Sequence, residues 1–240
     1  MKLRLLLKNK MKFFHYVLII LIVCSIQSCE KKQDEFTIED KAVFEAEING
    51  EKTILIESDS LIDIDTYINW NPSRQRSHGV RDYVIDIWQM NLGKFIMFDS
   101  PTTNHISINF VNHFYNWEYD ENGDVTKEQF ENILSNGTKD YSINYKDFPG
   151  ILIEWFDANG EKWTSSKVFL SGDSIPNVID NNENKFNINY SKFQNDLSDE
   201  RSYYQYLDIS FQCRLYNKDG ENIMIKNGKF KCMYRLFKII

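Results

Sequence analysis

Glycine and proline are scarce in this chain of 240 residues, which contains ten glycines and four prolines. Chains that stay disordered are rich in these residues and in charge, and they are poor in aromatic side chains. Aromatic residues make up 15% of this sequence. The composition therefore excludes disorder of the chain as a whole and favours a folded domain with a substantial core.

The motifs of several enzyme and metal-site classes are also missing. The sequence contains no Gly-x-Ser-x-Gly, phosphate loop, dinucleotide fingerprint, Cys-x-x-Cys or His-Glu-x-x-His. The sequence therefore contains no recognisable motif for nucleophilic catalysis, nucleotide binding or zinc binding. We expect no cofactor, no metal site and no catalytic residue, with a hydrolase that uses loop carboxylates as the alternative.

The first 28 residues have the layout of a secretion signal. They contain five Lys and Arg and no Asp or Glu, and they end in an apolar run from Tyr16 to Ile26. A run of about 11 residues is well short of the roughly 20 that cross a bilayer as a helix. We therefore predict a cleaved signal, whereas a membrane-spanning segment would require a stop-transfer pattern. Translation from Met1 or from Met11 would give the same mature protein.

Ile26-Gln27-Ser28-Cys29 resembles the lipobox of bacterial lipoproteins, and residues 30–35 resemble the export signals of surface-exposed Bacteroidota lipoproteins. The resemblance implies that Cys29 is acylated and becomes the N-terminus, so that lipid holds the protein on a membrane. We expect residues 1–28 to be removed, residues 29–40 to form a lipidated tether and residues 41–240 to form one domain. The expected address is the cell envelope, on either face of the outer membrane.

The charge of the mature chain bears on its partners. The signal carries five of the 28 basic residues and none of the 35 acidic ones, so the formal charge after cleavage is −12. A domain of this charge repels nucleic acid and anionic lipid headgroups. We therefore expect membrane contact through the lipid and no nucleic-acid partner.

Tight-turn dipeptides recur between apolar runs with a period of two residues, which is typical of antiparallel β-hairpins. The turn signals are Asn49-Gly50, Asn122-Gly123, Asn159-Gly160, Asp219-Gly220 and Asn227-Gly228. The strands that we expect are 43–48, 53–57, 84–88, 94–98, 105–111, 151–156, 161–169, 186–190 and three C-terminal strands.

One helix interrupts the strands. Thr126 and Gln129 have the spacing of a capping box, and Gly137 is the predicted stop. Phe130, Ile133 and Leu134 fall on one face of this helix of about 9 to 10 residues, which should lie against a sheet. The pattern predicts an all-β fold, mostly an antiparallel β-sandwich or an open barrel, with one short α-helix.

Three patches of the mature chain, 44–50, 157–166 and 225–230, resemble elements of uncharacterised Bacteroidota lipoproteins with β-sandwich domains. The resemblance implies a fold and an address and transfers no catalytic residue. Cys213 and Cys232 should both point inward. The expected register places them beyond the reach of a disulfide, so we expect buried free thiols, with a disulfide as the alternative.

Histidines and acidic clusters have simple interpretations. His105 and His113 share one side of a strand but lie about 26 Å apart if that strand is extended, so we expect exposed histidines and no shared metal. Residues 120–124 and 157–161 cluster oxygen atoms but lack the spacing of a calcium loop. Hairpin turns are the better explanation.

A ligand site is predicted from aromatic and basic residues in probable loops. Flat aromatic faces can stack on sugars or anchor a protein, and the arginines of the basic loop 70–81 can pair with a carboxylate or phosphate, although this loop can also be merely solvated. Trp155 and Trp163 are expected in the core instead. The candidate ligand-binding residues are Trp70, Arg74, Arg76, Trp117 and Tyr119. The hypothesis is a non-catalytic envelope lipoprotein that binds a glycan or a protein, with a hydrolase or an immunity-type or structural partner protein as alternatives.

Overall fold

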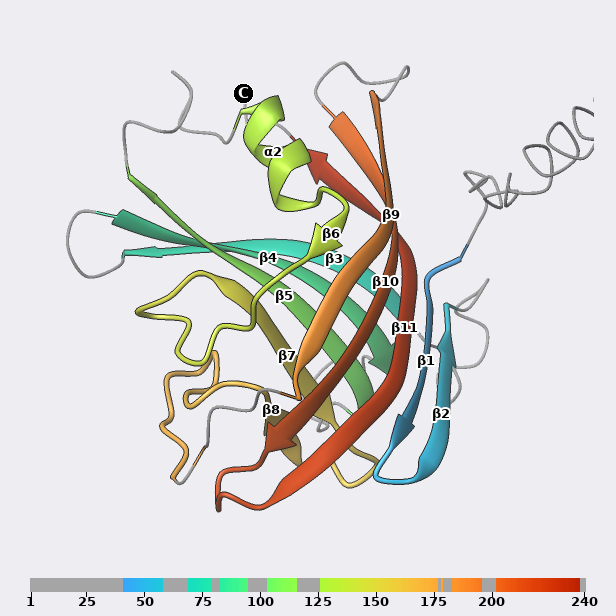
Figure 1. Cartoon of the computed structure of the whole chain (residues 1–240), viewed down its shortest axis with the longest axis vertical. Coiled ribbons are helices and arrows are strands. Elements are labelled where there is room, and N and C mark those ends of the chain that lie inside the picture. Colours follow the sequence, from blue (N-terminus) through green and yellow to red (C-terminus); the bar gives the residue numbers. More distant parts are fainter. Residues whose placement is uncertain are drawn as a thin grey trace, which may run out of the picture. The chain divides into compact units, whose positions relative to one another are not determined.

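The computed structural model divides the chain into two units, Met1–Ile38 and Glu39–Ile240, and the residues that it describes all belong to the second (Figure 1). The described residues are 41–57, 69–78, 83–94, 103–115, 126–176, 178, 183–195 and 202–237. Among them, no helix combines the length and the apolar content needed to cross a bilayer.

The described strands form one open sheet in which the named strand pairs are antiparallel, in the order β2-β1-β11-β10-β8-β7-β5-β4-β3, with β9 on β10 and β6 on β9. The prediction of a mostly antiparallel β fold with one short helix is confirmed. The strands are β1 Val43–Ile48, β2 Glu51–Ile56, β3 Asn69–His78, β4 Tyr83–Lys94, β5 Thr103–Tyr115, β6 Gly137–Thr138, β7 Gly150–Phe156, β8 Lys162–Thr164, β9 Lys185–Asn195, β10 Ser202–Tyr216 and β11 Asn222–Phe237.

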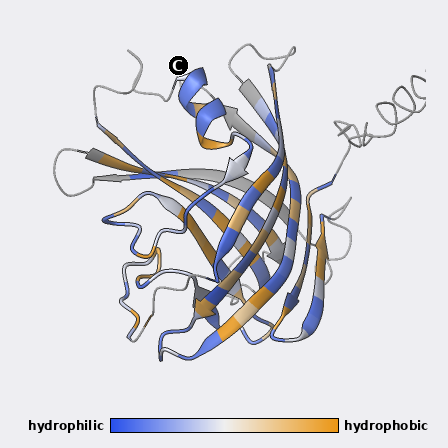
Figure 2. Cartoon of the chain, viewed as in Figure 1, coloured by the Kyte–Doolittle hydropathy of each residue, from blue (hydrophilic) through white to orange (hydrophobic). Residues whose placement is uncertain are grey.

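Period-two patterning places the core on one face of this curved sheet. Figure 2 shows apolar and polar residues alternating along β10 and β11. Apolar side chains of β1, β4, β5, β7, β10 and β11 meet in one cluster, in which Phe44 packs on Phe211 with ring centroids 6.1 Å apart. Trp155 and Trp163 are buried there as expected.

The two C-terminal cysteines are buried free thiols, as predicted. Cys213 lies opposite Ile225, and Cys232 lies opposite Leu207, so they are separated along the β10–β11 ladder. Burial raises the pKa of Cys213 to about 12. The neutral thiol is therefore the stable form in this apolar core.

The predicted helix is present as α2, Lys127–Ile133, and it is shorter than expected. The capping box is confirmed, because the amide of Gln129 donates to Thr126 Oγ1 over 3.2 Å and the amide of Thr126 donates to Gln129 Oε1 over 2.7 Å. Phe130 is buried against Trp88, with ring centroids 5.0 Å apart. Gly137 does not end the helix but begins β6, so that part of the prediction is wrong.

Four of the five predicted turns lie in described residues, and three of these four connect neighbouring strands. The fifth, Asn122-Gly123, lies outside the described residues. Asn49 and Gly50 join β1 to β2 with positive φ angles of 50° and 90°. Asn227-Gly228 was predicted as a turn between two strands, but β11 runs through it without a break. Both neighbours of β11 shift register there, because Asn227, at φ 53°, is the extra residue of a β-bulge. Two long strands therefore replace the three expected C-terminal strands.

The basic segment around Trp70 was predicted as a loop, but residues 69–78 form β3. The sequence of β3 contains Pro72 and lacks alternating apolar residues, so its pattern does not predict a strand. β3 is at an end of the sheet order and, among the described strands, pairs with β4 alone. An end strand tolerates Pro, because one of its edges needs no ladder hydrogen bonds.

β4 and β5 are buried on both faces. On the face away from the main core, Ile87, Val111 and Leu152 pack with Tyr145 and Val168 of the loop segments. Buried polar residues continue this face, among them His105, Ser107 and Asn109. The expectation that His105 is exposed is therefore wrong: its side chain is 5% exposed. Strand parity places a histidine on a face but does not reveal whether other segments cover that face.

Candidate functional site

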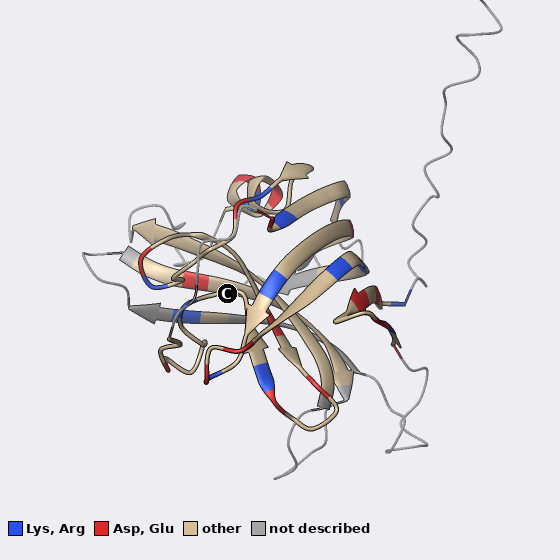
Figure 3. Cartoon of the chain, turned by 60° about the horizontal axis from the view of Figure 1, so that its bottom comes forward, with Lys and Arg blue, Asp and Glu red and all other residues tan. Residues whose placement is uncertain are grey.

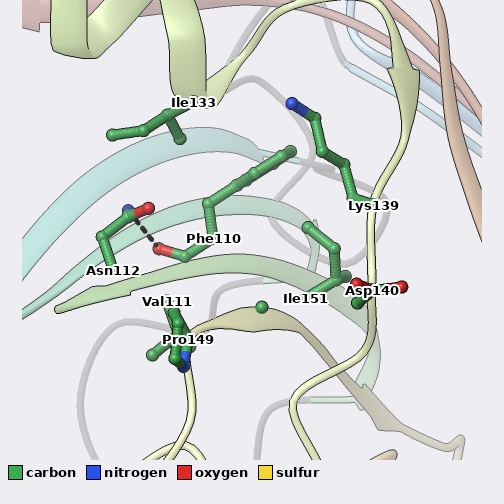
Figure 4. A pocket seen from close by; sticks show the side chains of 9 residues that line it. Phe110, Val111, Asn112, Ile133, Lys139, Asp140, Pro149 and Ile151 are labelled. Carbon is green, nitrogen blue, oxygen red and sulfur yellow. Dashed lines mark hydrogen bonds between the residues drawn. The ribbon is translucent and has the colours of Figure 1, made fainter.

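A pocket of about 260 Å3 lies between α2 and the start of β7 (Figure 4). Its walls come from β5, α2, the segment that follows β6, and β7. Most of its lining side chains are apolar, and the polar ones stand at its sides. The lining residues are Phe110, Val111, Asn112, Ile133, Lys139, Asp140, Pro149, Gly150 and Ile151.

Gly150 allows the segment 139–142 to lie directly against β7. Its φ of 145° is a conformation that other residues rarely adopt, and a Cβ there would lie 2.8 Å from Asp140 O and from Ser142 N. The amide of Ile151 donates to Asp140 O over 2.7 Å, and the amide of Ser142 donates to Ile151 O over 2.8 Å. These two bonds position the wall of the pocket that carries Lys139 and Asp140.

Lys139 brings a positive charge to the pocket. Its Nζ donates to Asn132 O over 3.3 Å and to Ser135 Oγ over 3.2 Å, at the C-terminal end of α2. Burial lowers the pKa of Lys139 because the surrounding apolar groups disfavour its charge. An ammonium has three N–H donors, so one is left for a ligand.

Two acceptors complete the polar set. Asn112 Nδ2 donates to Phe110 O over 3.1 Å and to Asp86 O over 3.4 Å, which fixes the orientation of the amide. Its Oδ1 and the exposed carboxylate of Asp140 accept no hydrogen bond from the residues that the structure describes. Figure 4 shows Asn112 on one side of Phe110 and Lys139 with Asp140 on the other.

The apolar part of the pocket is rigidly supported. Phe110 packs edge-on against Phe186, with ring centroids 5.8 Å apart and planes at 84°. Next to the pocket along the chain, Phe148 is 62% exposed and precedes the lining residue Pro149. An apolar floor with a few fixed polar groups is the usual composition of a small-ligand site. Among the described lining residues there is a single carboxylate, whereas glycosidases use a pair.

Arg76, the one predicted ligand-binding residue whose side chain the structure describes, does not line this pocket. Trp70 and Arg74 are in β3, in register with Leu92 and Trp88. The Nε of Arg76 lies 3.7 Å from Oδ2 of the buried Asp86, so its charge already has a partner within the domain. The side chains of Trp70 and Arg74, and the whole of Cys29, Trp117 and Tyr119, lie outside the described residues.

The pocket residues Asn112, Lys139 and Asp140 were missed because none belongs to a motif. The only sequence signal near them was the apolar face of the predicted helix, which indicated that it covers a sheet. Which polar residues meet at such a contact depends on strand order, and β5 and β7 are neighbours although more than 30 residues separate them in the chain.

The buried carboxylate of Glu154 has partners within the domain. Glu154 is buried, and its Oε1 lies 3.1 Å from Lys162 Nζ and accepts from the amide of Leu170 over 3.1 Å. Burial raises the pKa of Glu154, and the ammonium of Lys162 partly opposes that shift. Within the described residues, no three His, Cys, Asp or Glu side chains are grouped as a metal site requires.

Two further carboxylates meet at one amide. Asn217 Nδ2 donates to Glu161 Oε1 over 2.7 Å and to Glu221 Oε2 over 3.0 Å. Both glutamates follow turn glycines, and neither lines the pocket. The contact joins two turns of the sheet, which is a structural role. The hydrolase alternative stays an untested prediction.

Comparisons with protein families, with curated proteins and with solved structures gave no match to this chain. Any functional inference therefore depends on the residues themselves.

Proposed function

We propose that the chain is an exported lipoprotein, held at the outer membrane by acyl chains on Cys29, whose β domain binds a glycan without catalysis. The observation that carries the glycan assignment is the pocket, where an ammonium and two oxygen acceptors surround an apolar floor. Sugar hydroxyls both donate and accept hydrogen bonds, and the C–H faces of a sugar ring are apolar. A sugar therefore matches both parts of the lining.

The size of the pocket supports the same class of ligand. Pockets for drug-sized molecules span about 300–1,000 Å3, and this one, at about 260 Å3, is slightly smaller. It suits a single ring unit at the end or side of a larger glycan. Phe148, exposed next to the pocket, offers an aromatic face to a second unit.

Binding of the full-length chain to a glycan array, followed by titration of the sugars that bind, tests this proposal. Asp140→Ala should weaken binding about tenfold, because it removes a charged acceptor from the pocket. The variant should fold normally, since the carboxylate of Asp140 contacts no other described group. Asp219→Ala, in an exposed turn elsewhere, is the matched control. The absence of any bound sugar, or equal binding by the two variants, would contradict the proposal.

A protein-binding role is the second candidate, and β2 favours it, because among the described strands β2 pairs with β1 alone. Ile54 and Ile56 are 48% and 49% exposed on this end strand. An end strand with exposed apolar residues can pair with another strand. If β2 pairs with β2 of a second copy, sedimentation should show dimers that Ile54→Lys converts to monomers. Monomers at all concentrations would exclude this pairing.

A further inference from the structure

The charge of Lys139 is the feature of the pocket that a neutral sugar leaves unused. Its ammonium is half-buried and makes hydrogen bonds to a carbonyl and a hydroxyl, both uncharged. No carboxylate of the described residues lies within ion-pair distance of it. Charged groups that are partly removed from water are usually paired. An anion at this position would therefore gain more binding free energy than a hydroxyl would.

The other two polar groups restrict what kind of anion fits. Asn112 Oδ1 and the carboxylate of Asp140 can only accept hydrogen bonds, so the ligand must also carry donors. A fatty acid or an aromatic acid has one anionic group and no hydroxyls for these acceptors. A phosphate group would place two negative charges near Asp140, and the described lining residues include no arginine to hold them.

Building on the proposed function, we infer that the pocket selects an acidic sugar, a ring with hydroxyls and one carboxylate. The carboxylate lies at Lys139 Nζ and accepts its free N–H. Hydroxyls donate to Asn112 Oδ1 and to Asp140, and the ring covers Phe110 and Ile151. Each polar group of the lining then has a partner of the complementary kind.

The net negative charge of the chain makes the selection of an acidic sugar depend on the pocket itself. Acidic residues outnumber basic ones by 35 to 28, so the surface as a whole repels anions. Attraction of a carboxylate therefore depends on one local cation and on the geometry around it. Binding should weaken with added salt, but less steeply than at a basic surface where several charges contribute.

The decisive experiment compares acidic and neutral sugars of the same ring on the full-length chain. Glucuronate and galacturonate, with glucose and galactose as their neutral counterparts, are titrated by calorimetry or ligand-observed NMR. We expect the acidic sugars to bind about tenfold more tightly. Lys139→Gln should abolish this preference, because it weakens the binding of the acidic sugars more than that of the neutral ones. Lys139→Arg should retain a preference, and Lys218→Gln, at an exposed turn, is the control.

The outcomes separate this inference from the proposed function. Equal binding of acidic and neutral sugars overturns the selection for acid but leaves glycan binding intact. An acidic preference that persists in Lys139→Gln places the carboxylate elsewhere and also overturns the inference. Binding of neither class contradicts the proposed function itself. The comparison between sugars uses the unaltered chain, so it holds even if a Lys139 variant folds poorly.

Discussion

At the scale of single residues, the second face of β5 shows how polar side chains are accommodated inside a small β domain. Asn109 Oδ1 accepts from Gln89 Nε2 over 2.9 Å and from Ser107 Oγ over 3.2 Å, and its Nδ2 donates to Leu152 O over 3.2 Å. A buried amide is tolerated when its donors and acceptors are satisfied in this way. His105, on the same face, differs because its protonation state changes with pH.

We predict that His105 makes the stability of the domain depend on pH. Burial, assisted by the charge of Lys162, lowers the pKa of His105 to about 4. Below its ordinary pKa of about 6.5 the unfolded chain binds a proton that the folded domain excludes. The stability that the domain has while His105 is neutral in both states is fully present above pH 6.5 and is lost as the pH falls towards 4. The loss amounts to about 3 kcal/mol.

Denaturant unfolding of wild type and His105→Gln at pH 7, 6, 5 and 4 measures this effect. The wild type should lose about 3 kcal/mol more than the variant between pH 7 and pH 4. His113→Gln, on the same strand and face, controls for the loss of a histidine. Parallel pH profiles for wild type and His105→Gln would contradict the prediction.

A second prediction concerns Gly150, which shapes the wall of the pocket. Gly150→Ala should destabilise the domain by about 2–4 kcal/mol, because the new Cβ would overlap the backbone of Asp140 and Ser142. Gly137→Ala is a matched control, since Gly137 has a similar φ of 122° but open space where a Cβ would be. Unfolding in urea should show a clearly smaller loss for the control. Equal losses would mean that backbone strain alone explains the effect.

At the scale of elements, two turns of the sheet share one geometry. In the turn 157–161, Asp157 Oδ1 accepts from the amides of Asn159 and Glu161. In the turn 217–221, Asn217 Oδ1 accepts from the amides of Asp219 and Glu221. The first turn tolerates Asp or Asn at its start, whereas the second requires Asn, because the amide Nδ2 also holds two glutamates together.

We predict that exchange of Asp and Asn destabilises the second of these turns much more than the first. Asn217→Asp keeps the acceptor but replaces the donor by a third carboxylate, and should cost about 2 kcal/mol at pH 7. Asp157→Asn keeps the acceptor and should change stability by less than about 1 kcal/mol. Thermal unfolding at pH 7 compares them, and equal effects of the two variants would contradict this account.

The elements show where reasoning from sequence succeeds. Turns and caps depend on a few adjacent residues, so Asn49-Gly50 and the Thr126 capping box were predicted correctly. Asn227-Gly228 has the same local chemistry as a hairpin turn. Here, however, Gly228 allows β11 to lie close to β10, because a Cβ at this position would lie 2.9 Å from Phe211 O. β3 was missed because the pairing edge of β4, rather than its own propensity, makes it a strand. Both errors arise from long-range contacts.

At the scale of the whole molecule, the described surface carries charges of both signs. Figure 3 shows Lys and Arg interspersed with Asp and Glu along the strands and turns. Some form cross-strand pairs, such as Lys52 with Glu45 at 2.9 Å and Lys231 with Asp208 at 3.8 Å. Exposed pairs of this kind contribute little stability. Because their charges are opposite, they do not form a large patch of one sign. The net acidity of the chain makes electrostatic adhesion to anionic lipids unfavourable, so the proposed membrane attachment would have to come from another interaction.

The proposed lipid anchor supplies that attachment, and it makes a prediction for the intact chain in a bacterial host that acylates lipoproteins. Each buried methylene contributes about 0.8 kcal/mol, so two or more acyl chains hold a protein stably where one does not. Because this attraction is apolar, the protein should stay with membranes through high-salt washes that release charge-bound proteins.

Labelling with radioactive palmitate should mark the wild type and Cys24→Ser but not Cys29→Ser. Intact mass should show a mature chain that begins at Cys29 and carries acyl groups. A labelled Cys29→Ser variant would place the lipid on another residue. A mature N-terminus upstream of Cys29, or an unlabelled wild type, would remove the anchor, and the membrane address would then need a different physical basis.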